Sequence, residues 1–229
     1  MKIYINKASK ILIAAIVAFV TFSCDLELQK EWEYVPEPFG NKPTGMTALD
    51  WLEMINNDPK YQDENGLPEF NFLLQAIERT GLEDLYLGQD TTKTFLLLRN
   101  SAWNGNNQLI QNMTGNINNP LDSISDERLE HVLRYHIIDD YLSQPAIPKN
   151  DFFLYYQTLV PGDTGMIEIN KRLFDQSIRI NTSIARIGSP STPSNMPSTS
   201  RGTVVNLHNF IFNNGIGHQV NSYVRYQPF

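Results

Sequence analysis

The spacing of apolar residues changes part-way along the chain, and this change most constrains the fold. Up to about residue 138, apolar residues recur mainly at helical spacing, with one β-branched and apolar run at residues 94–98. Beyond Asp139-Asp140 they alternate with polar residues or gather in aromatic-rich runs, which is typical of strands. Helices and strands that are segregated along a chain favour an α+β domain over an alternating α/β domain.

The clearest helix pattern begins at Phe70. Leu73, Leu74 and Ile77 follow it at i+3, i+4 and i+7, so they share one face of a 3.6-residue period. Gly81 then supplies a residue that can adopt the left-handed conformation of a helix C-terminus. The pattern therefore predicts an amphipathic helix that ends at Gly81.

Capping residues predict two more helices on either side of this one. Thr47 and Asp50 have the spacing of a capping box, so a short helix is expected to begin at Thr47. Asn100 or Ser101 can cap another helix that runs through Trp103. Residues 47–68 are accordingly assigned to an N-terminal helical extension.

The second half of the chain predicts strands and two loop insertions. The expected strands are the aromatic run 152–156, the alternating pairs Ile167/Ile169 and Ile178/Ile180, and a hairpin of residues 203–212 and 216–226. Residues 104–119 are rich in Asn and Gly, and residues 189–200 are rich in Ser and Pro. We therefore expect loop insertions near residues 104–124 and 185–202.

The N-terminus carries the features of a bacterial lipoprotein signal. Three lysines precede an uncharged apolar run at residues 11–22, and the only cysteine of the chain, Cys24, follows it. Residues 1–23 are expected to be a signal peptide, Cys24 to be lipidated, and residues 24–46 to form a proline-containing tether. The alternative is an ordinary secretory signal with an incidental thiol. With a single cysteine, no internal disulfide can form.

The charge of the chain excludes one class of partner. Residues 1–23 hold three of the 18 basic residues and none of the 25 acidic residues, so the remainder has a formal charge of −10. An acidic surface argues against nucleic acid, which requires a basic patch. It also disfavours electrostatic docking to anionic lipid, so membrane contact is expected through the lipid anchor.

Segments of the chain resemble, in order, the motifs of the fasciclin I-type domain family. The matching segments are the helix and strand of residues 70–82 and 94–103, the Tyr-His segment of residues 133–138, and the closing Asn-Gly-x-x-His hairpin of residues 204–220. Two departures stand out. Leu97-Leu98-Arg99 replaces the family's Ala-Pro-Thr, and Gly217 stands where a large aliphatic residue is usual.

This resemblance implies a fold and a function. The expected fold is α+β, with helices packed on a wedge of two mostly antiparallel β-sheets over residues 69–229. The expected function is non-catalytic: adhesion to, or binding of, a glycan, a matrix component or a protein. Similarity to bacterial fasciclin-like lipoproteins implies a surface-exposed outer-membrane protein of a Gram-negative bacterium. It leaves open an alternative role as an accessory structural subunit of a TonB-dependent nutrient importer.

The four histidines do not form a metal-binding pattern. His131 and His136 are five positions apart and do not share a helical face, and no further ligand completes a zinc motif. His136 continues the apolar stripe of a helix that Ser125 can cap, so a buried, hydrogen-bonded histidine is expected there. Tyr135, His136 and His218 are assigned to the structural core, as the resemblance also implies. We expect no catalytic residue, no metal and no cofactor.

One aromatic cluster is a candidate contact surface. Phe153, Tyr155 and Tyr156 lie in the aromatic run, and such rings stack on sugars and anchor protein interfaces. The alternative is that strand alternation turns half of the rings into the core.

Overall fold

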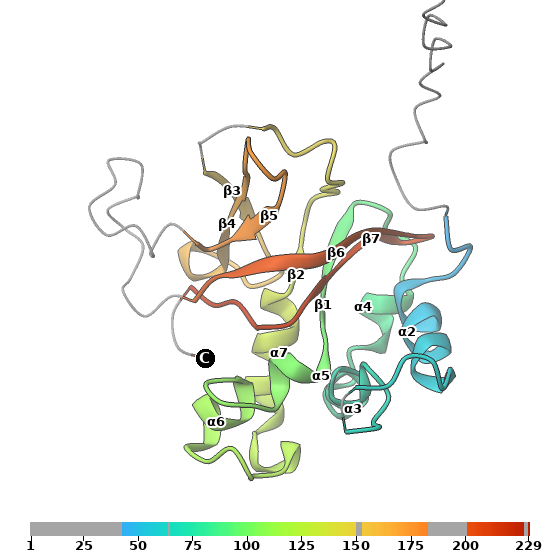
Figure 1. The fold of residues 1–229 in the computed structure, drawn as a ribbon, viewed down its shortest axis with the longest axis vertical. Coiled ribbons are helices and arrows are strands. Elements are labelled where there is room, and N and C mark those ends of the chain that lie inside the picture. Colours follow the sequence, from blue (N-terminus) through green and yellow to red (C-terminus); the bar gives the residue numbers. More distant parts are fainter. Residues whose placement is uncertain (1–42, 64, 150–152, 183–200, 227–228) are drawn as a thin grey trace, which may run out of the picture. The chain divides into compact units, whose positions relative to one another are not determined.

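The structure, a computed structural model, describes residues 43–63, 65–149, 153–182, 201–226 and 229 (Figure 1). These residues lie within one unit, Pro38–Phe229. The predicted signal peptide, most of the predicted tether, most of the predicted insertion near residues 185–202, and Phe152 lie outside the described residues. No helix in the described segments is long and apolar enough to cross a membrane.

Helices dominate the first half of the described chain and strands the second, which confirms the α+β prediction. The helices are α2 (Ala48–Asn57), α3 (Asn71–Thr80), α4 (Glu83–Leu87), α5 (Asn100–Trp103), α6 (Leu109–Thr114) and α7 (Asp126–Tyr135), with 3₁₀ turns η1 (Leu121–Ser123) and η2 (Asp163–Gly165). The strands are β1 (Lys93–Leu98), β2 (Ile137–Ile138), β3 (Leu154–Gln157), β4 (Met166–Lys171), β5 (Ile178–Ile180), β6 (Thr203–Phe212) and β7 (Gly215–Val220).

The strands form one mixed sheet in the order β2-β1-β7-β6-β5-β4-β3. Strands β1 and β7 pair in parallel, and the other neighbours are antiparallel. Two sheets were expected, and β6 joins them into one. Its first residues pair with β5, and the rest of the strand pairs with β7. The β6–β7 register shifts twice around Leu207, and Asn209 has a positive φ of 64°. Such bulges bend a strand, which allows β6 to serve both halves.

Three predicted elements have the expected local geometry. Helix α3 ends at Gly81, which is left-handed at φ 64°, and strand β1 is buried at every position after Lys93. At the start of α2, Thr47 and Asp50 form the predicted capping box. Ser125 stands at the N-cap of α7, but its side chain makes no capping hydrogen bond.

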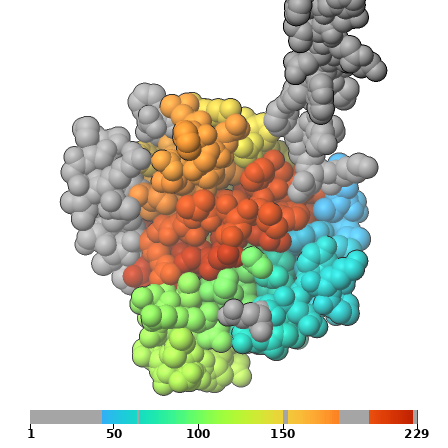
Figure 2. All heavy atoms as spheres, viewed as in Figure 1, coloured from blue at the N-terminus to red at the C-terminus, as the bar shows by residue number. Residues whose placement is uncertain are grey.

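The predicted extension at residues 47–68 is part of the domain core. Trp51 of α2 packs against Phe70, Phe210 and Phe212, with ring centroids 5.8, 4.8 and 5.5 Å away. Asn214 in the β6–β7 turn accepts a hydrogen bond from the Ala48 N–H over 2.9 Å, which caps α2 from the sheet. The hairpin, which crosses the face of the domain in Figure 2, therefore holds α2 in place.

The segment near 104–124 is not a plain loop. It contains α6 and η1, and it buries Leu109, Ile110 and Leu121 in the core. A loop was predicted because the segment is rich in Asn and has few apolar residues. Instead, Leu109 and Ile110 are buried in a short helix, which ends at the left-handed Gly115.

The second hairpin strand ends earlier than predicted. Strand β7 stops at Val220, where the sequence pattern continued to Tyr226. The Asn221 carbonyl accepts a hydrogen bond from Ser101 Oγ over 3.3 Å, which turns the chain towards α5. This departure from the sheet places Asn221 at the edge of a pocket.

Candidate functional site: a polar pocket beside β1 and β7

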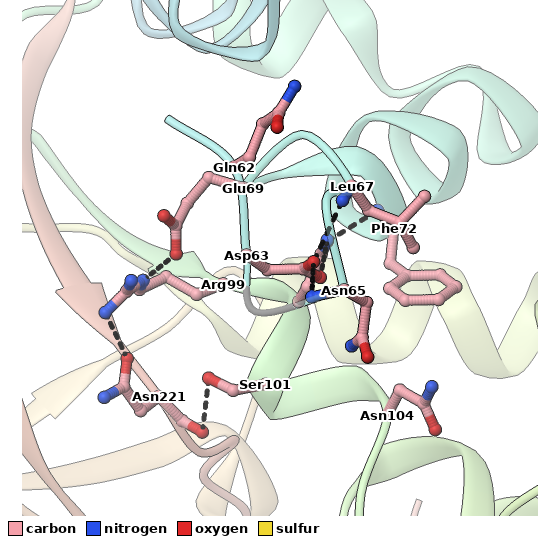
Figure 3. Close-up of a pocket in the computed structure, with 11 residues that line it drawn as sticks. Gln62, Asp63, Asn65, Leu67, Glu69, Phe72, Arg99, Ser101, Asn104 and Asn221 are labelled. Atoms are coloured by element: carbon pink, nitrogen blue, oxygen red, sulfur yellow. Dashed lines mark hydrogen bonds and ion pairs between the residues drawn. The ribbon is translucent and has the colours of Figure 1, made fainter. Parts of the chain in front are cut away.

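A pocket of about 360 Å³ lies where three segments of the described chain meet (Figure 3). The loop between α2 and α3 supplies Gln62, Asp63, Asn65, Leu67 and Glu69, and α3 adds Phe72. The segment that follows β1 supplies Arg99, Asn100, Ser101 and Asn104, and Asn221 follows β7. The parallel pairing of β1 and β7 brings their ends together, since Leu98 is opposite Val220. The polar residues that directly follow both strands therefore reach the same site.

Arg99 is held between two of these segments. Its Nε donates to Glu69, and its Nη1 donates to Asn221 Oδ1 over 3.0 Å. Glu69 is mostly buried, with its side chain 12% exposed, and Arg99 is 30% exposed. A guanidinium fixed at two points keeps one face of the pocket rigid.

Asp63 is also held in place. Its Oδ1 accepts the N–H groups of Asn65 and Leu67 over 2.8 and 3.0 Å, and its Oδ2 accepts from Asn100 Nδ2 over 2.9 Å. Partial burial raises the pKa of Asp63, but these hydrogen bonds outweigh it and leave the pKa below its usual value. Asp63 therefore stays ionised, with its lone pairs used by the protein.

Asn100 joins the loop, the strand and the next helix. Its side chain is 3% exposed, donates to the Pro68 carbonyl over 2.8 Å, and accepts the N–H of Phe72 over 3.3 Å. Since Phe72 is in the first turn of α3, Asn100 caps α3 from outside that helix. We predicted Asn100 as a cap for its own helix, but Arg99 occupies that position and makes no side-chain cap.

Two amide side chains that line the pocket make no hydrogen bond to the described residues. The side-chain amides of Asn65 and Asn104 are exposed and form no hydrogen bond within the described chain. Figure 3 shows both near the ring of Phe72, on the side of the pocket opposite Arg99 and Asn221. The pocket thus offers unpaired amides beside a half-buried aromatic ring.

The chemistry of the pocket suits binding. Its lining contains no histidine or cysteine, and the Ser101 hydroxyl donates to the Asn221 carbonyl. A serine without a neighbouring base is not activated as a nucleophile. Among the described residues, no group of three or more His, Cys, Asp or Glu side chains is arranged to hold a metal ion.

The structure places the three predicted core residues in the interior and away from the pocket lining. Tyr135, His136 and His218 are each at most 2% exposed. The Tyr135 hydroxyl donates to the Met166 carbonyl over 2.9 Å and accepts from Asn181 Nδ2 over 3.0 Å. Tyr135 therefore joins α7 to β4 and to the residue that follows β5.

Both buried histidines are neutral and fully bonded. Nε2 of His136 accepts the Val224 N–H over 3.0 Å, so its Nδ1–H donates to the Val132 carbonyl over 2.7 Å. Nδ1 of His218 accepts the Asn209 N–H over 3.3 Å, so its Nε2–H donates to the Leu142 carbonyl over 2.8 Å. Burial lowers the pKa of each to about 4, against a smaller raising effect of the carbonyl bond.

The three residues of the candidate aromatic cluster differ in burial. Tyr155 is exposed and donates to Glu168 over 3.4 Å, whereas Phe153 is half-buried and Tyr156 packs against the core. None of the three lines the pocket. Cys24, the predicted lipidation site, lies outside the described residues.

Sequence reasoning did not identify the pocket. Two local features bear on it: the polar residues directly after the apolar strand 94–98, and the turn at residues 63–66. Taken locally, the first feature predicts only a helix cap. Only the β1–β7 pairing brings them together with Asn221.

Comparison with known proteins agrees with this fold. A family model for the Fasciclin domain matches residues 68–223. Among solved structures, a FAS1 domain pair from the insect cell adhesion molecule Fasciclin I matches with a TM-score of 0.50 and 12% sequence identity, over 79% of this chain and 51% of that chain. This chain thus spans about half the length of that domain pair. No curated protein matches significantly. Since the family model covers more than half of the sequence, the chain belongs to the fasciclin domain family.

Proposed function

We propose that this protein is a non-catalytic, lipid-anchored protein of the bacterial outer membrane whose fasciclin domain binds a ligand at the cell surface. The observation that carries the proposal is the Fasciclin domain over residues 68–223, because a structural relative with this fold is a cell adhesion molecule. The ligand classes are a glycan, a matrix component or another surface protein.

The pocket supports binding as the mode of action. Small-molecule sites are concave, about 300–1,000 Å³ in volume, and carry a few placed polar groups on an otherwise preformed wall. The pocket of about 360 Å³ has this character, with fixed Arg99 and Asp63 and unpaired amides at Asn65 and Asn104.

The anchor is supported by the sequence around Cys24. Lipid chains add about 0.8 kcal/mol for each buried CH₂, so two or three chains hold a protein at a membrane. We expect Cys24→Ala to move the protein from the membrane to the soluble fraction. Ser23→Ala is the matched control, since it keeps a small residue before the cut and leaves the thiol. Retention of Cys24→Ala at the membrane, or an unmodified cysteine by mass spectrometry, contradicts the anchor.

One observation favours the alternative role as a subunit of a nutrient importer. Leu173 and Phe174, in the turn between β4 and β5, are 58% and 93% exposed. Contiguous exposed apolar surface marks protein interaction sites, and these two neighbouring side chains contribute such surface. Purification in mild detergent distinguishes the two roles. The subunit role is supported if a transporter is recovered in stoichiometric amount with the wild type and with the control Leu207→Asp, but is lost with Phe174→Asp. Recovery of the protein alone supports the binding role.

A further inference from the structure

We infer that the pocket lined by Asp63, Asn65, Phe72, Arg99, Asn104 and Asn221 binds a short, neutral saccharide. This inference rests on the proposed binding function, and it names the ligand class and the site. The starting point is the set of polar groups that the fold leaves unpaired on one side of the pocket.

The unpaired groups have the chemistry of sugar recognition. A sugar hydroxyl both donates and accepts hydrogen bonds, and a side-chain amide also offers both a donor and an acceptor. Asn65 and Asn104 present such amides, and neither is used within the described chain. Nη2 of Arg99 likewise has no hydrogen bond to a described residue, so it is a further donor for a hydroxyl oxygen.

An apolar surface stands beside these amides. Phe72 is half-buried and lines the pocket, and the neighbouring Leu67 is 40% exposed. The C–H face of a sugar ring packs on an aromatic ring while its hydroxyls reach the polar groups around the edge. Phe72 offers this combination with Asn65 and Asn104, which lie beside its ring (Figure 3).

The charges of the pocket select against anionic sugars. The guanidinium of Arg99 is neutralised by Glu69, and the carboxylate of Asp63 remains ionised. The lining therefore carries one net negative charge, which repels uronic acids and phosphorylated sugars. A cationic ligand gains little, because three hydrogen bonds already use the oxygens of Asp63.

The site is also ready to bind without rearrangement. Asp63 is fixed by Asn65, Leu67 and Asn100, and Arg99 by Glu69 and Asn221. Preorganisation of this kind reduces the entropy that a weakly contacting ligand would otherwise have to overcome.

The test uses the purified lipoprotein in mild detergent and defined sugars. Neutral di- and trisaccharides of glucose, galactose and mannose, and the matching uronic acids, are titrated while saturation transfer to sugar protons is recorded by NMR. We expect a neutral sugar to bind, with affinity reduced about fivefold to tenfold in Asn65→Ala and in Asn104→Ala, as for loss of one hydrogen bond. Phe72→Leu keeps an apolar side chain but removes the ring, and we expect a loss of about tenfold.

A matched control and two contrary results make the test decisive. Asn118→Ala removes an exposed amide outside the pocket, and binding should be unchanged. Binding that is indifferent to Asn65→Ala, Asn104→Ala and Phe72→Leu, or that prefers the uronic acids, overturns the inference. Failure of every sugar in a protein that still captures a surface protein overturns the saccharide site alone; steady turnover of a bound sugar overturns the non-catalytic function itself.

Discussion

The N–H of Val224 donates a hydrogen bond to Nε2 of His136 over 3.0 Å, joining residues that are 88 positions apart. The same imidazole donates to Val132 one turn earlier in α7. One buried side chain therefore connects the end of α7 with the segment that follows β7, and its neutral form is required at both nitrogens.

Replacement of His136 tests this link. His136→Ala leaves the Val224 N–H without its partner and opens a cavity in the core, so we expect the free energy of unfolding to fall by about 1–3 kcal/mol or more. Urea unfolding measures the change. His131→Ala, at a less buried position of the same helix, should have a smaller effect. Equal effects of the two substitutions would contradict the role of His136.

The buried histidines predict a loss of stability in mild acid. Burial lowers the pKa of His136 and His218 from 6.5 to about 4, so the unfolded chain binds more protons than the folded chain below pH 6.5. Above pH 6.5 the neutral histidines make their full contribution to the free energy of unfolding, and this contribution is lost as the pH falls towards 4. At about 1.4 kcal/mol per pKa unit, the loss is roughly 3 kcal/mol for each histidine. The lowered pKa of Asp63 adds to the loss only below its usual value of 3.8.

Urea midpoints measured between pH 7 and pH 4 check this dependence. His136→Gln removes one of the titrating groups, so its stability should fall less steeply over this range than that of the wild type. A wild-type protein whose midpoint is flat from pH 7 to pH 4 would show that the two histidines do not remain buried and neutral.

Replacement of Asn100, which lines the pocket, is expected to destabilise the fold. Asn100→Ala removes the cap of α3 and the amide that binds Asp63, and we expect a loss of about 1–3 kcal/mol. Asn104→Ala, four positions later, removes an exposed amide without an internal partner and should change stability by less than about 0.5 kcal/mol. Thermal unfolding of both variants measures the difference, and similar melting temperatures would refute the capping role.

Gly217 predicts a steric effect in the sheet. A Cβ atom at this position would lie 2.6 Å from the Phe212 ring and 3.0 Å from Leu97, so these side chains fill the space that a large aliphatic residue would occupy. We expect Gly217→Val to lower the free energy of unfolding by about 1–3 kcal/mol. Because Phe212→Leu makes room, the double variant should lose less than the sum of the single losses in a double-mutant cycle. Simple additivity would contradict the contact.

Patterns that depend on burial could be predicted from the sequence. Helix α3 was predicted from the apolar stripe between Phe70 and Ile77, and β1 from the apolar run of residues 94–98. In both, the spacing of the apolar residues indicates which face of the element is buried. The same reasoning failed in the Asn-rich segment, where burial of Leu109 and Ile110 decides the structure against the local composition.

The pocket could not be predicted in this way. Asn100 caps a helix that lies earlier in the chain, and Asn221 reaches Arg99 from 122 positions away. Neither hydrogen bond produces a periodic pattern in the sequence. Each depends on a strand pairing that local propensity does not specify.

The parallel pairing of β1 with β7 has a consequence for how the domain is made. On one edge, β1 pairs with β7, which is translated only after all the intervening helices and strands. Pairings of such wide separation slow folding, since a long loop must close before any contact rewards it. The β7-facing edge of β1 therefore stays unpaired until β7 has been synthesised, and unpaired strand edges are prone to aggregation during folding.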